Sequence, residues 1–221
     1  NYTNVFARAS YTKNIDQIRQ LTDFESVIRT STFFNSSFAD ENMNVFGRIQ
    51  RTFGKVTASL NSSFNYSKIN QFIQRIQSLN EVLNQTYTPG IRTNFLIAPN
   101  INIRYRYSIT NNFQGDRQTK FITRSPSARF DAYILKKITI KSDYSYTLQE
   151  QVGGDAQSFQ IWNASISYRK NKDSKWEYEV KGTNLLNINS QVRNSANNIS
   201  VFNASTFIQP RFITVRAVYK L

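Results

Sequence analysis

Residues 56–66 read Val-Thr-Ala-Ser-Leu-Asn-Ser-Ser-Phe-Asn-Tyr, so that small polar side chains recur at every second position of the stretch. Successive side chains of a β-strand point to opposite faces, and the stretch therefore predicts a strand with one apolar and one polar face. The same period of two recurs along the chain. It predicts ten strands, at residues 5–12, 43–53, 56–66, 91–98, 101–110, 128–136, 138–148, 159–169, 176–184 and 212–221.

The connections between these strands alternate in length. Tight links are expected at residues 54–55, 99–100, 136–137 and 171–174, and long polar links at residues 13–41, 67–90, 111–127, 149–158 and 185–210. Antiparallel strands joined in this way place the short turns at one end and the long links at the other, as in an outer-membrane β-barrel. We predict an all-β fold: a portion of an antiparallel transmembrane β-barrel of about ten strands, with short periplasmic turns and long extracellular loops.

Two of the tight turns predict a strand register. Pairing of Phe53 with Val56 would place Ile49 opposite Leu60 and Val45 opposite Phe64, with apolar side chains on one side of the sheet. Across residues 98–100, Ile97 would face Ile101 and Phe95 would face Ile103. The apolar faces of neighbouring strands agree in both hairpins.

The composition excludes several kinds of chemistry. The 221 residues include no His and no Cys, so the chain has no Cys nucleophile, no Ser-His-Asp triad and no zinc site of the usual kind. No run of the residue types AVILMFWYC exceeds four, whereas a membrane-spanning helix needs ~20 apolar residues. We expect neither an enzyme nor a cofactor or metal site.

The net charge of +14 suggests a nucleic acid, an anionic membrane or an acidic ligand as partner, without selecting among them. Basic and aromatic residues interleave at residues 104–107, as in proteins that bind single-stranded nucleic acid. In a strand, however, Arg104 and Tyr105 point to opposite faces and cannot form one platform. Glu177 and Glu179, ~7 Å apart on one strand, have the spacing of a glycosidase pair, but a charged ladder on a polar face explains them better.

The two faces have different expected environments. Side chains expected to point outward to lipid are Leu60, Phe64, Ile103, Tyr105, Ile166, Val215 and Tyr219, and those expected to point inward are Asn61, Arg104, Arg106 and Arg216. The three arginines would attract anions, although pairing with Asp131, Asp143, Glu177 or Glu179 is the favoured account of them. Tyr168 and Trp176 flank residues 171–174, where an aromatic girdle would lie at a membrane surface.

The carboxyl-terminal part of the chain carries a family resemblance. It rests on Ile-Trp-Asn-Ala-Ser-Ile-Ser-Tyr at residues 161–168, Val-Lys-Gly-Thr-Asn-Leu-Leu-Asn at 180–187, Pro-Arg-Phe at 210–212 and Val-Tyr-Lys-Leu at 218–221. These segments resemble the final strands of TonB-dependent outer-membrane receptors, including SusC-like and related large barrels. The resemblance implies a barrel of about 22 strands, plugged by an amino-terminal domain and energised through TonB.

The resemblance also implies a function and partners. Residues 1–221 would be the carboxyl-terminal strands of a transporter in the outer membrane of a Gram-negative bacterium, which takes up a scarce nutrient or chelate. Its partners would be outer-membrane lipid, the remaining barrel strands, the plug domain and the TonB complex, with a surface lipoprotein left open and no nucleic acid. The substrate and the ligand-binding residues stay unknown, because this family binds cargo through variable loops and the plug.

Several alternatives remain open. The chain could be a self-contained small outer-membrane barrel with a structural or adhesion role, or a soluble basic β-protein that binds nucleic acid. Residues 67–90 could hold an external helix, since apolar residues there have helical spacing, or an extended strand hairpin, which we favour. The missing initiating Met and leader predict a processed chain or a fragment of one. Together with the resemblance they predict an incomplete barrel, without plug and earlier strands, in which the first and last strands do not pair with each other.

Overall fold

The structure of the chain is a computed structural model that describes residues 1–25, 28–73, 76–96, 99–115, 117–171, 173–196 and 201–219. These residues form strands, and no helix occurs among them that could cross a membrane. The strands are β1 (Tyr2–Asn14), β2 (Gln17–Glu25), β3 (Ile28–Ser36), β4 (Asp40–Phe53), β5 (Val56–Ile73), β6 (Ile76–Thr93), β7 (Asn100–Gln114), β8 (Arg117–Ile134), β9 (Ile138–Gln151), β10 (Gln157–Tyr168), β11 (Trp176–Thr183), β12 (Ser190–Ala196), β13 (Val201–Phe207) and β14 (Phe212–Tyr219).

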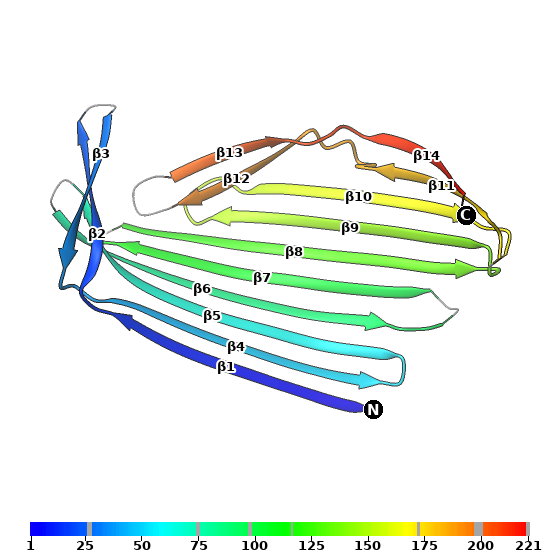
Figure 1. Cartoon of the computed structure of the whole chain (residues 1–221), viewed down its shortest axis with the longest axis horizontal. Coiled ribbons are helices and arrows are strands. Elements are labelled where there is room, and N and C mark those ends of the chain that lie inside the picture. The colour runs from blue at the N-terminus through cyan, green and yellow to red at the C-terminus, as the bar shows by residue number, and fades with distance from the viewer. Residues whose placement is uncertain are drawn as a thin grey trace.

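One broad sheet forms the body of the molecule, in the order β1-β4-β5-β6-β7-β8-β9-β10-β11-β14 (Figure 1). Every neighbouring pair along this path is antiparallel. Nine of these strands contain most of a strand that the sequence predicts. The strand predicted at residues 91–98 is misplaced, because β6 ends at Thr93. The prediction of an all-β antiparallel fold is confirmed.

The long links differ from the prediction, because most of their residues are in strands. Residues 13–41 contain the hairpin β2–β3, which joins β5 through a short parallel pairing, and residues 185–210 contain the separate hairpin β12–β13. Within residues 67–90 the described residues, 67–73 and 76–90, continue β5 and β6 as an extended hairpin and not as a helix, as predicted. Residues 111–127 likewise continue β7 and β8.

The predicted register is correct at one hairpin and shifted at the other. Phe53 pairs with Val56 and Ile49 with Leu60, across a turn in which Gly54 has a φ of 57°. The expected pairing of Phe95 with Ile103 is wrong, because β6 ends at Thr93 and Ile103 pairs with Ile91.

The shift at the second hairpin arises from a longer loop in place of a tight turn at residues 99–100. The side chain of Asn100 accepts a hydrogen bond from the backbone N–H of Phe95 (2.6 Å) and donates one to its carbonyl (3.0 Å). The pairing therefore slips by four residues, an even number, and the apolar side chains stay on the same face. Ile97 lies outside the described residues.

The links β4–β5, β6–β7, β8–β9 and β10–β11 lie at one end of the sheet, the end at which Figure 1 marks the N- and C-termini. The backbone N–H of Gly54, in the β4–β5 turn, donates a hydrogen bond to the side chain of Asn1 (3.0 Å), and Trp176 at the start of β11 pairs with Tyr219 near the chain end. The hairpins β2–β3 and β12–β13 project at the opposite end. The four links that the sequence predicts to be short therefore share one end of the sheet, as predicted, although the links at the opposite end are not all long. Leu221 lies outside the described residues.

The sheet is a single layer with little interior. The chain exposes 15197 Å², against about 10,400 Å² expected for a compact monomer of its 25.7 kDa mass. Among the described apolar side chains only Phe121 and Ala132 are buried. No pairing joins β1 to β14 in the part of the chain that the structure describes, so the sheet is open at both edges, as expected.

Candidate functional site

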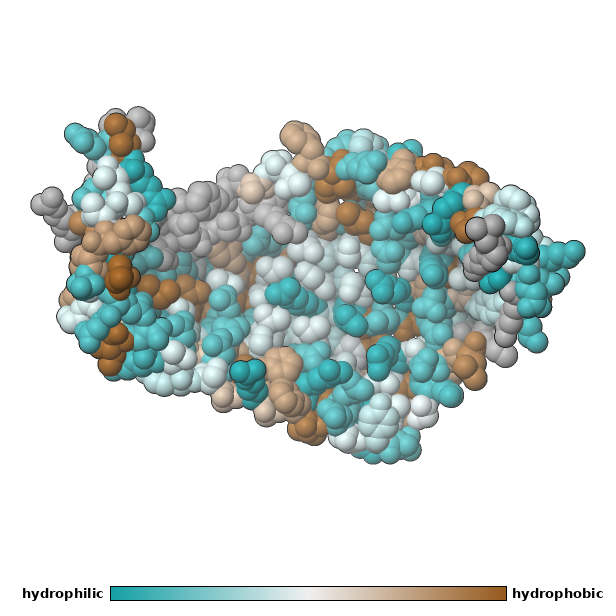
Figure 2. Space-filling view, in the orientation of Figure 1, coloured by the Kyte–Doolittle hydropathy of each residue, from teal (hydrophilic) through white to brown (hydrophobic). Residues whose placement is uncertain are grey.

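Cross-strand pairing divides the sheet into a polar face and an apolar face. Asn61 pairs with Arg48, and Gly90 pairs with Arg104 on the same side, so we call the side that carries these residues the polar face. Figure 2 views this face, on which teal and white side chains cover the centre of the sheet and brown ones lie at the margins. The separation of faces that the period of two predicts is confirmed.

The opposite face, which we call the apolar face, is largely uncovered in the part of the chain that the structure describes. The side chains predicted to point outward lie on it, and several are largely exposed, including Ile103 (52 %), Ile166 (55 %) and Val215 (77 %). An exposed apolar surface that spans ten strands is far larger than the patches found on soluble monomers.

Aromatic side chains on the apolar face follow a slanted line. Tyr66 on β5 lies at the level of Val152 on β9, as successive cross-strand partners show. β9 carries two aromatic residues on this face, Tyr144 and Tyr146. Tyr146, the one farther from the turn end, lies six residues closer to that end than Val152, and the paired Tyr87 and Tyr107 lie between these levels. Six residues are ~20 Å along a strand and four strand spacings are ~19 Å, which gives a slope of ~45°. Strands of outer-membrane barrels tilt by about 35–45° from the membrane normal. An aromatic girdle parallel to the membrane surface would therefore cross the strands of the sheet along a line of about this slope.

Charged pairs lie just beyond this aromatic line and follow the same slant. Lys68, two residues beyond Tyr66, forms an ion pair with Glu81 (3.9 Å). On β8 and β9, Arg124 forms an ion pair with Glu150, and Arg124 lies opposite Leu148, two residues beyond Tyr146. The apolar face thus passes from apolar to aromatic to charged, in the order expected where hydrocarbon gives way to headgroups.

The predicted inward arginines lie on the polar face and have different partners. Arg216 forms an ion pair with Glu179 (2.7 Å), as favoured. For Arg104 and Arg106 that account is wrong, because neither forms an ion pair with a described carboxylate. Asp143 instead accepts a hydrogen bond from the side-chain amide of Asn163 (2.8 Å).

Asn184, within the segment that carries the family resemblance, organises the link between β11 and β14. It is 1 % exposed, and its amide donates to the carbonyl oxygens of Ile188 (2.8 Å) and Gln209 (3.0 Å). Its side-chain oxygen accepts from the N–H of Ile188 (3.0 Å), and its own N–H donates to the side chain of Asn163 (2.9 Å). Two of the segments that resemble the receptor family, residues 161–168 and 180–187, therefore meet at this residue.

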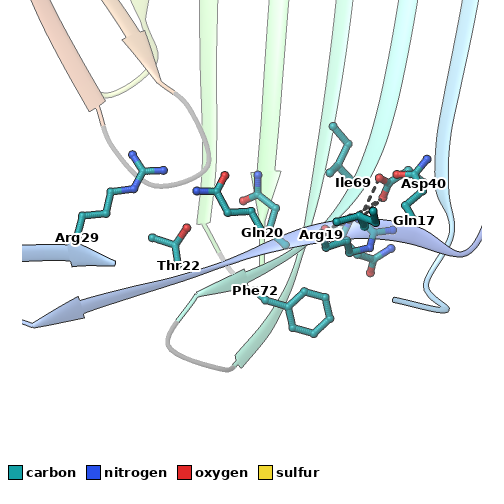
Figure 3. Close-up of a pocket in the computed structure, with 11 residues that line it drawn as sticks. Gln17, Arg19, Gln20, Thr22, Arg29, Asp40, Ile69 and Phe72 are labelled. Atoms are coloured by element: carbon teal, nitrogen blue, oxygen red, sulfur yellow. Dashed lines mark hydrogen bonds and ion pairs between the residues drawn. The ribbon is translucent and has the colours of Figure 1, made fainter. Parts of the chain in front are cut away.

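A second buried cluster fixes the base of the hairpin β2–β3 (Figure 3). The guanidinium of Arg19, 6 % exposed, donates to both carboxylate oxygens of Asp40 at 2.9 Å. It also donates to the carbonyls of Phe38 (2.5 Å) and Asn70 (2.7 Å) and to the hydroxyl of Ser36 (3.0 Å). Sequence reasoning missed this cluster, because its members are separated along the chain and neither charge stands out from its neighbours.

The described residues contain no group of three or more acidic side chains arranged to hold a metal ion. Glu177 and Glu179 lie on the polar face, and Glu179 forms an ion pair with Arg216 there. Comparison of the chain with protein-family models, with curated proteins and with solved structures gives no match.

Proposed function

We propose that the chain is the carboxyl-terminal part of the barrel wall of a TonB-dependent transporter in the outer membrane of a Gram-negative bacterium. The observation that carries the proposal is the apolar face, exposed over ten strands and bordered by slanted aromatic and charged residues. In hydrocarbon a sheet cannot keep unpaired edges, so β1 and β14 require further strands. The unpaired edges and the resemblance of residues 161–221 favour a large barrel over a small closed one.

In this proposal the chain is not an enzyme and has no cofactor. Its apolar face contacts lipid, and its polar face lines a lumen through which a scarce nutrient or chelate passes. The plug domain and the TonB complex would gate that passage, as the family resemblance implies. The soluble nucleic-acid alternative has less support, because Arg104 and Tyr105 stand on opposite faces of β7 and the apolar face would lack a cover.

Labelling of single cysteines tests the orientation. The chain contains no Cys, so Lys55→Cys and Lys137→Cys probe two turns, and Asp155→Cys probes the link between β9 and β10. In intact cells a membrane-impermeant maleimide should label Asp155→Cys and leave both turn variants unlabelled until the outer membrane is opened. Labelling of the turns in intact cells would contradict the orientation, and extraction of the protein without detergent would contradict the membrane assignment itself.

A charge placed on the apolar face should destabilise the protein in the membrane. Leu60 lies between Ile49 and Pro89 on that face, and Leu60→Arg should lower the free energy of unfolding by ~2–4 kcal/mol if the site is near the bilayer midplane. Asn65→Arg adds the same charge on the polar face, between Asn44 and Asn84, and should change it by less than ~1 kcal/mol. Urea unfolding from lipid vesicles measures both, and equal effects would argue against a lipid-facing surface.

A further inference from the structure

A hollow on the polar face between β4 and β7 carries three arginines and no carboxylate. Its volume is about 220 Å³, and its walls include Arg48, Arg92 and Arg104 from three different strands. The four ion pairs of the described residues involve none of these side chains. Like charges that share a hollow repel one another, and an anion between them would remove that cost.

The floor of the hollow is polar and shielded from solvent. Gln50 and Thr57 line it and are 8 % and 7 % exposed. Gln50 accepts a hydrogen bond from Arg48, and the hydroxyl of Thr57 lies 3.1 Å from that of Thr52. These contacts hold the floor in place, whereas the side chains of the three arginines are exposed and accessible to a ligand from the lumen side.

Gly90, on β6, leaves space for the side chain of Arg104. A Cβ on Gly90 would lie 3.3 Å from Cγ of Arg104 and 3.3 Å from the carbonyl oxygen of Ile103, so a larger residue would press on the arginine stem. The preceding residue, Pro89, has no N–H to donate to β7, and the pairing of β6 with β7 is interrupted there. The side chain of Arg104 can therefore lie across the sheet towards β6.

We infer that Arg48, Arg92 and Arg104 form a binding site for an oxyanion, either a phosphoryl or a carboxylate group, carried by the transported solute. A guanidinium presents its N–H groups as a fork that matches the paired oxygens of both groups. The role in transport rests on the proposed function, whereas binding itself depends only on the polar face. The site therefore predicts that the transported solute, which the sequence does not identify, is an anion.

The test is isothermal titration calorimetry of the detergent-purified protein, with its remaining barrel strands, and two probes, inorganic pyrophosphate and citrate, at physiological salt. We expect saturable binding of at least one probe. Arg92→Gln and Arg104→Gln should each weaken it by about tenfold or more, the usual cost of one charge-assisted hydrogen bond. Gly90→Ala should weaken it as well, because the added methyl group displaces Arg104. Tighter binding of pyrophosphate would identify a phosphoryl ligand, and tighter binding of citrate a carboxylate.

Arg216→Gln is the matched control, since it removes the same charge from the same face but from an arginine already paired with Glu179. It should change the affinity by less than about twofold, and heat-modifiable migration on gels shows that each variant is folded. Lack of saturable binding by folded protein, or equal weakening by Arg216→Gln, would overturn the site. Neither result touches the membrane assignment, which fails only if the protein is extracted without detergent.

Discussion

Asn184→Ala should lower the free energy of unfolding by about 3–5 kcal/mol, through the loss of three hydrogen bonds at a fully buried position. The substitution leaves the carbonyls of Ile188 and Gln209 without their donor and the N–H of Ile188 without its acceptor. Alanine must also adopt the φ of 51° that Asn184 has, a conformation that asparagine tolerates better. Urea unfolding of the detergent-purified protein measures the change.

Asn187→Ala provides the control, because Asn187 has a nearly equal φ of 55° but accepts a single side-chain hydrogen bond, from the N–H of Arg211 (3.1 Å). The backbone cost of alanine is then the same at both sites, and the difference reports the lost hydrogen bonds. We expect Asn187→Ala to cost about 1–2 kcal/mol. Equal costs would show that Asn184 does not hold the β11–β14 link together.

The division of the sheet into two faces could be predicted from the sequence because it depends on a local rule. Alternation along one strand fixes which side chains share a face, and pairing of apolar faces then fixes which strands agree. The predicted faces are correct even at the β6–β7 loop, where the predicted register is wrong. The observed pairing of Ile91 with Ile103 differs from the predicted one by an even number of residues. A slip of an odd number would have placed apolar residues among the arginines.

The added hairpins could not be predicted in the same way. β2–β3 lies outside the ten-strand path, and its position depends on long-range contacts such as the edge-to-face packing of Phe34 on Phe72 (4.8 Å). Contacts of this kind leave no periodic signal in the sequence. The two partners are far apart along the chain, and each strand contributes only one residue to the contact. For the arginines, the sequence identified the face, but whether a carboxylate lies within reach depends on side-chain positions.

Asp40→Ala should destabilise the base of the hairpin β2–β3 by about 3–5 kcal/mol, because it leaves the buried guanidinium of Arg19 without a counter-charge. It also removes the acceptor for the N–H of Asn70 (2.9 Å). The loss is local, so the hairpin should open while the ten-strand sheet stays paired. Hydrogen exchange of the β2 amides and the rate of proteolysis within residues 17–36 both report this opening.

The exposed pair at the other side of the sheet shows why burial decides the size of this effect. Glu179→Ala breaks an ion pair in which the side chain of Arg216 is 62 % exposed, and solvent can replace the lost partner, so we expect a cost below about 1 kcal/mol. At the hairpin, Arg19→Ala combined with Asp40→Ala should cost less than the sum of the single substitutions, since no charge is then left buried alone. Additive costs, or equal effects of Asp40→Ala and Glu179→Ala, would show that the Arg19–Asp40 pair does not fix the hairpin.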